Sequence, residues 1–241
     1  MISIFLKEVN EFLNSLIAYV VISVFLIGIG LLMWVFPDTN VLDYGYASME
    51  PLFSLGPYMF MFLIPAITMK SFAEEKRSGT LELLQTLPFR DSDILIGKFL
   101  AGFVLVIFSI LPTIVYYYSL SQLGNPQGNL DTPGIIGSYI GLMLLGGVFT
   151  AFGIFSSVLT GNQIVSFILG AFLCFFFYSG FDSLSGINLW ADWSYYISSL
   201  GIMPHYTSLS RGLLDVADVT YFLGLITIVL LVSQFILGLK K

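Results

Sequence analysis

The residue types that most often carry catalytic or metal chemistry are scarce in this chain. It has one histidine, His205, and one cysteine, Cys174, so a histidine-rich metal cage and an internal disulfide are both excluded. Gly97-Lys98 is followed by Phe99 and lacks the upstream glycine of a nucleotide-binding phosphate loop. No nucleophile elbow or zinc-protease motif occurs either. We therefore expect no catalytic residue, no metal site and no directly bound cofactor.

Residues 74–98 form the most informative charged stretch. Ser78, Gly79 and Thr80 are good helix N-cap types, and Glu82 would lie favourably in a first helical turn. Leucines follow at helical spacing until Pro88, which ends the pattern. We predict a two-turn amphipathic helix at about residues 78–88. So short a helix is marginal alone, so it packs either on its own bundle and the bilayer surface or on a partner protein.

A second pair of charges lies near the C-terminus. Arg211 is the one basic residue in the connecting segments whose other charged residues are all acidic, such as residues 182–218. It stands four residues before Asp215. The ordinary interpretation is a surface ion pair along a helix. The alternative is a gate at the external face of the protein.

The composition identifies the setting of these residues. The chain of 241 residues is 57% hydrophobic and 10% charged, with a mean hydropathy of +0.92. Soluble domains are typically about 25% charged, so this is an integral membrane protein whose surroundings include membrane lipids. Its 9 basic and 15 acidic residues leave no basic stripe for nucleic acid.

Charge-free runs predict an all-α protein with six membrane-spanning helices. A fifty-residue run without charge is too long for one span, and the polar cluster at 160–163 is the natural turn within it. No ionisable group falls deep inside a predicted span, which disfavours an ion-coupled carrier. The six predicted spans are residues 15–36, 52–72, 99–120, 134–159, 164–181 and 219–239.

The flanking segments give the orientation and the domain organisation. Eight of the nine basic residues fall at one side of a six-span arrangement, so both termini are predicted to be cytoplasmic. Residues 1–14 read as an amphipathic interfacial helix, with Ile2, Leu6, Val9 and Leu13 on one face. Residues 15–241 form the six-span domain, and its aromatic stretch 182–218 is expected to hold short external helices.

Small residues and prolines mark the places where spans should meet or bend. Gly137 and Gly141, with a second pair at 147 and 151, form a ridge that permits close helix packing, within the chain or between two copies. Pro65 and Pro112 interrupt the helical hydrogen bonds of spans two and three and predict kinks there.

The charged loop resembles a known family. The run from Glu75 to Glu82, followed by Leu84, Pro88 and Gly97-Lys98, is similar to the hallmark loop of ABC-2-type permeases, the six-span membrane subunits of type 2 ABC exporters. The resemblance implies a coupling helix that docks into a separate ATP-binding subunit, which uses the ATP. The implied coupling residues are Glu75, Gly79, Thr80, Leu81, Glu82, Leu84 and Pro88.

Residues 205–221 narrow the resemblance. They are similar to the corresponding segment of the gliding-motility-associated permeases of the GldF type. That resemblance implies export across a bacterial inner (plasma) membrane, and a second permease subunit in a homodimer or heterodimer, possibly with a large extracytoplasmic domain. The alternative is a non-transporting anchor that transmits the work of a bound ATPase to an extracytoplasmic partner.

Overall fold

The computed structural model describes residues 1–43, 45–82, 90–186 and 193–239, and these residues form helices and connecting turns without a strand. Six helical stretches of this described part are long and apolar enough to cross a membrane, which confirms the predicted all-α, six-span fold. They are α2 (Leu16–Trp34), α3 with α4 (Glu50–Ser78), α6 with η1 and α7 (Asp91–Leu123), α8 (Thr132–Leu159), α9 with η2 and α10 (Gln163–Ser185), and α13 (Val216–Leu239).

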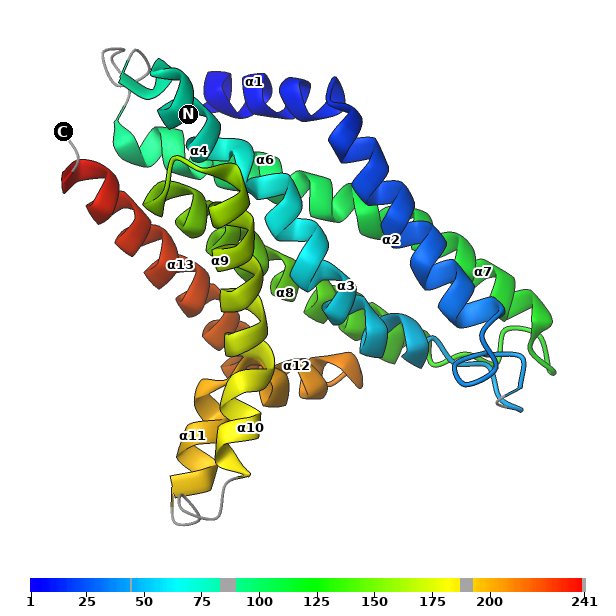
Figure 1. Cartoon of the computed structure of the whole chain (residues 1–241). Helices are drawn as coiled ribbons and strands as arrows, with labels where there is room; N and C mark the ends of the chain where they lie inside the picture. Colours follow the sequence, from blue (N-terminus) through cyan, green and yellow to red (C-terminus); the bar gives the residue numbers. More distant parts are fainter. Residues whose placement is uncertain (44, 83–89, 187–192, 240–241) are drawn as a thin grey trace.

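The two ends of the bundle differ in how many basic residues they carry. Helix α1 (Ile2–Leu13), the end of α4 (Lys70–Ser78), the start of α6 (Asp91–Ile110) and the end of α13 all lie at one end (Figure 1). We call this the basic end, because Lys7, Lys76, Arg77 and Lys98 lie on these segments. The opposite end carries α11 (Ser194–Leu200) and α12 (Ile202–Ser210). We call it the acidic end, because the charged residues on the described segments next to these helices are acidic except for Arg211.

Helix α8 is the central span, and most of its residues are buried. Its glycines explain how neighbouring helices come so close. A Cβ atom added to Gly137 would lie 2.9 Å from the Cα atom of Gly212, and one added to Gly141 would lie 2.7 Å from Leu209 Cβ. The predicted small-residue ridge is therefore used to pack α12 and its C-terminal turn within this chain.

Two spans are interrupted near the predicted prolines. α3 (Glu50–Thr68) continues through Pro65, and the break comes at Met69, before α4 begins. In the third span, Pro112 lies in a short 3₁₀ turn, Leu111–Thr113, between α6 and α7 (Ile114–Leu123). Proline removes a backbone donor and crowds the preceding turn, which accounts for the 3₁₀ turn at Pro112, whereas the break at Met69 lies after Pro65 and Met69 N still bonds to the Pro65 carbonyl.

The turn between α8 and α9 (Gln163–Phe175) lies where the polar cluster predicted it. Thr160 ends α8, and the Asn162 side chain accepts a hydrogen bond from Ile164 N at 2.9 Å, capping α9. In the segment predicted to hold short helices, the structure has α10 (Phe181–Ser185), α11 and α12 before α13 begins at Val216.

Candidate functional site

A sharp corner separates α4 from the predicted coupling segment. Gly79 ends α4 with φ +72°, in the left-handed region that favours glycine, and helical structure resumes at Thr80. The Ser78 hydroxyl contacts both the Glu74 carbonyl, at 2.9 Å, and the Thr80 hydroxyl, at 2.8 Å. The Ser-Gly-Thr run therefore closes α4 and turns the chain into the next helix.

The described start of the coupling segment presents two different faces. Thr80 and Glu82 are exposed, whereas Leu81 is partly buried against the apolar cluster of the basic end, which includes Phe72, Ile94 and Leu95. Leu81 thus contacts its own bundle, one of the two alternatives that the sequence left open for this helix. Leu84 and Pro88, the other two predicted coupling residues, lie outside the described residues.

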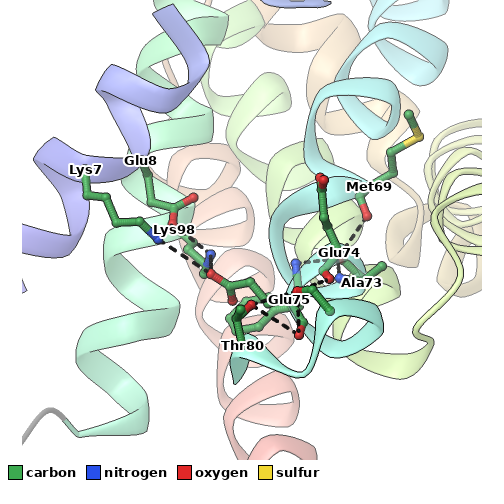
Figure 2. A network of polar contacts seen from close by, with 11 residues as sticks. Lys7, Glu8, Met69, Ala73, Glu74, Glu75, Thr80 and Lys98 are labelled. Carbon is green, nitrogen blue, oxygen red and sulfur yellow. Dashed lines mark hydrogen bonds and ion pairs between the residues drawn. The ribbon is translucent and has the colours of Figure 1, made fainter. Parts of the chain in front are cut away.

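Glu75, the first predicted coupling residue, belongs to a buried charge cluster (Figure 2). The Lys98 ammonium lies 2.8 Å from Glu8 Oε1 and 2.8 Å from Glu75 Oε1. The Lys98 side chain is only 2% exposed, and its Nζ atom lies 5.1 Å from the centre of the Phe72 ring. Lys7 approaches the same two carboxylate oxygens at 3.7 and 3.9 Å from the exposed side. We call Glu8, Glu75 and Lys98 the charge clamp.

Gly97 makes the clamp possible by letting α1 approach α6. A Cβ atom at position 97 would lie 3.1 Å from Ile4 Cγ2 and 3.4 Å from the Phe5 backbone nitrogen. Ile4 and Glu8, one helical turn apart, are therefore the buried residues of α1. Ile2 and Leu6 on the predicted apolar face stay 69% and 53% exposed, which suits the lipid contact expected of an interfacial helix.

Helix α4 is also fixed to the central span. The Ser157 hydroxyl of α8 accepts hydrogen bonds from the backbone nitrogens of Phe72 and Ala73, at 2.8 and 2.9 Å, where the break at Met69 disturbs the helical ladder. The Lys76 ammonium donates to the Val158 carbonyl near the C-terminus of α8. The base of the coupling segment is thus attached to α8, α6 and α1.

Sequence reasoning missed two of the three clamp residues. Span three was expected to begin at Phe99, but α6 already begins at Asp91 and buries Lys98 in its second turn. Glu8 was assigned to no site, because the apolar face of α1 suggested that other residues pack. The signal available was Lys98 itself, a lone charge in an otherwise apolar helical run, which must be paired if it is buried.

The predicted Arg211–Asp215 pair does not form. α12 ends at Ser210, and Gly212 has φ +81°, so residues 211–215 are not helical and the i,i+4 geometry is lost. Arg211 is exposed and makes no ion pair with the described residues. Asp215 accepts a hydrogen bond from Ala217 N at 3.0 Å, ahead of α13.

Arg211 instead lines a cavity of about 570 Å³ at the acidic end. The cavity lies between the start of α3, the start of α8 and α12, and its lining includes the carboxylates Glu50 and Asp131. Tyr206 forms part of its buried wall and donates a hydrogen bond from its hydroxyl to the Phe53 carbonyl, at 2.6 Å. Burial raises the pKa of the Tyr206 hydroxyl well above its ordinary value, so this donor keeps its proton.

His205 joins three helices at the acidic end. Its Nδ1 atom lies 2.7 Å from Asp218 Oδ1 on α13, and its Nε2 atom lies 3.0 Å from the Ser199 carbonyl on α11. The ring stacks on Tyr221, with 4.0 Å between ring centres. The Asp218 carboxylate and the Ser199 carbonyl are both acceptors, so each contact is a hydrogen bond only when the ring nitrogen that faces it carries a proton. We call these residues the histidine cluster.

Neither cluster forms a metal site. Within the described part of the chain, no three His, Cys, Asp or Glu side chains come together as a metal site would require. The charge clamp has no nucleophile or histidine base, and its groups are committed to each other. Its ion pairs can hold α1, α4 and α6 in fixed positions relative to one another.

Six helices able to span a membrane and an amphipathic first helix are the features of a multi-pass membrane protein. The family model of the ABC-2 family transporter proteins matches residues 2–239. The chain therefore belongs to the ABC-2 transporter family, whose members are the membrane subunits of ABC transporters and work with an ATP-binding subunit. A search of curated proteins returned no match to this chain.

Proposed function

We propose that this chain is the permease subunit of an ATP-driven exporter of the gliding-motility, GldF-like type, in a bacterial inner membrane. A separate ATP-binding subunit hydrolyses the ATP, and a second permease subunit completes the transport unit. The gliding-motility assignment rests on the resemblance of residues 205–221, and the export assignment on that of residues 74–98. The family membership supports the broader function of an ABC permease.

The orientation follows from charge. The basic end carries α1, the C-terminal end of α4, the start of α6 and the C-terminal end of α13 (Figure 1). Basic loops are retained on the cytoplasmic side of a membrane. We therefore place the basic end in the cytoplasm, where an ATP-binding subunit can reach it, and the cavity lined by Arg211 at the external face. Arg211 and Asp215 remain our candidates for an external gate.

The observation that carries the proposal is the corner at Gly79. It directs the coupling segment away from α4 and leaves Thr80 and Glu82 exposed, while Leu81 holds the segment to the bundle. An exposed face on a segment whose base is fixed at three helices suits a docking surface, because a partner's push is then delivered to the bundle.

Co-purification with the cognate ATP-binding subunit tests this proposal. Glu82→Lys reverses an exposed charge and should abolish recovery of the ATPase, while the permease keeps its expression and thermal stability. Glu11→Lys makes the same charge change at an exposed position of α1 and should leave recovery unchanged. Full ATPase recovery with both Glu82→Lys and Leu84→Asp would remove the docking assignment.

A further inference from the structure

The charge clamp joins the two sides of one loop to a third helix. Glu75 lies on α4, four residues before the corner at Gly79, and Lys98 lies on α6, after the segment returns. Their 2.8 Å contact therefore closes the base of the coupling loop. The same ammonium reaches Glu8 of α1, also at 2.8 Å, across ninety positions of sequence (Figure 2).

The burial of the clamp makes it more than an ordinary surface bridge. Exposed ion pairs contribute little, because water competes for each charge. The Lys98 side chain is 2% exposed and the Glu8 side chain 6%, so in this structure their charges are compensated mainly by each other and by Glu75. A buried charge that loses its partner is strongly disfavoured, so these groups must move together or exchange partners within the cluster.

We propose that Lys98 is a positioning residue for coupling, which holds α1 and the base of the coupling segment together as one moving unit. A displacement that the ATP-binding subunit imposes on the segment is then passed to α1 and to the lipid surface that α1 contacts. This inference rests on the proposed function, since it requires the ATPase to dock at the segment.

A buried ion cluster suits such a role, because it fixes the geometry of the groups that it joins more than it adds to stability. Well-packed apolar groups of similar volume often stabilise a protein as much as a buried ion pair does. Apolar side chains, however, can slide past one another, whereas one ammonium between two carboxylates fixes their separation. Lys7, near the same two oxygens from the exposed side, extends the cluster to four alternating charges.

The test follows α1 in the assembled complex with its ATPase. The single native cysteine is replaced by Cys174→Ala, and an environment-sensitive fluorophore is attached at Glu11→Cys, an exposed position of α1. In the otherwise unchanged complex, ATP binding should shift the emission of this probe. In Lys98→Met the shift should be lost, while the ATPase still co-purifies and hydrolyses ATP.

Two further variants separate positioning from simple loss of charge or folding. Arg77→Met removes a basic charge from an exposed position of α4 that makes no ion pair with the described residues, and should leave the shift intact. Reversing all four charges, as Lys7→Glu, Glu8→Lys, Glu75→Lys and Lys98→Glu, keeps every contact of the cluster between opposite charges and should restore the shift, even where Lys98→Met fails to accumulate.

The outcomes distinguish this inference from the proposed function. If the ATPase does not bind the unchanged chain, the proposed function fails. If the ATPase binds but the probe on α1 does not respond to ATP, or responds equally in Lys98→Met, the clamp does not couple α1 to the segment and the inference is overturned. Failure of the variant with all four charges reversed to restore the shift, with the ATPase bound, also contradicts it.

Discussion

The charge clamp and the histidine cluster lie at opposite ends of the bundle, and each ties helices outside the central spans to a span. The clamp uses the Lys98 side chain, which is 2% exposed and whose ammonium is shared by two carboxylates. The histidine cluster uses a ring that is 21% exposed, with one carboxylate, one backbone carbonyl and one aromatic ring. The first arrangement tolerates no unpaired state, whereas the second can lose a contact to water.

This difference indicates where the molecule is built to be rigid. At the basic end, three helices converge on one buried ammonium, and Ser157 adds two hydrogen bonds to the backbone of α4. At the acidic end, helices α11 and α12 are short, and α12 borders a cavity of about 570 Å³. We therefore expect the basic end to be the more rigid of the two.

The largest effect is expected at the clamp. Lys98→Met leaves Glu8 and Glu75 with only the more distant, half-exposed Lys7 as a counter-charge, and removing one partner of a buried ion pair costs about 3–5 kcal/mol. We expect a clear fall in the thermal unfolding temperature of the detergent-solubilised chain. Replacing all three groups, as Glu8→Gln, Glu75→Gln and Lys98→Met, should recover most of it. An unchanged unfolding temperature for Lys98→Met would show that Lys98 is not buried.

Two glycines at close helix contacts, Gly212 against α8 and Gly97 against α1, should give the next largest effect. Gly212→Ala forces a side chain into φ +81° and within 2.3 Å of the Gly134 Cα atom. Left-handed strain of about 1–2 kcal/mol adds to overpacking of about 1–3 kcal/mol. Gly97→Ala meets mainly the Ile4 side chain, at 3.1 Å, and should cost less. Equal unfolding temperatures for the two variants would contradict the close approach of α12 to α8.

A smaller effect is expected at the histidine cluster. His205→Ala leaves the Asp218 carboxylate, whose side chain is 13% exposed, without its 2.7 Å partner. The loss of a partner from a mostly buried polar group costs about 1–3 kcal/mol. Limited proteolysis should then cut near α11 and α12 sooner than near α1. His205→Gln retains an N–H donor, so its cleavage rate near α11 and α12 should lie between those of the unchanged chain and His205→Ala. Faster cleavage near α1 in His205→Ala would mean that His205 does not hold the acidic end.

The smallest effect on stability is expected at the exposed charges of residues 211–215. Asp215→Ala removes the acceptor for Ala217 N and should cost about 1 kcal/mol, whereas Arg211→Ala should change stability by less than about 0.5 kcal/mol. Thermal unfolding of the two variants checks this order. A greater loss for Arg211→Ala would reveal a structural ion pair at Arg211.

The spans were predictable because a membrane helix is a local feature of composition. The charge-free runs and the cluster at 160–163 needed no knowledge of tertiary contacts, and Asn162 capped α9 where the turn was expected. The pairing of Glu8 with Lys98 joins positions ninety residues apart. No local pattern specifies such a pairing, since it depends on Gly97 bringing α1 against α6.

The candidate site was predictable only in part, for a related reason. Glu75 and Gly79 could be selected from their motif, but the face of Leu81 depends on how the segment leans on the bundle, which the spacing of leucines does not determine. The helical pair of Arg211 with Asp215 was wrong because Gly212 adopts a positive φ and ends the helix one turn too early. Backbone conformation at a single glycine decided that outcome.

The most direct test of the account is the side of the membrane to which the basic end faces. In a Cys174→Ala background, a cysteine at Ser78, next to the corner at Gly79, is treated in intact cells with an impermeant thiol reagent, alongside a cysteine at Asn125 near the other end of the third span. We predict that Ser78→Cys is protected until the cells are permeabilised and that Asn125→Cys is labelled at once. Labelling of Ser78→Cys in intact cells would put the coupling segment outside the cell and contradict docking to an ATPase.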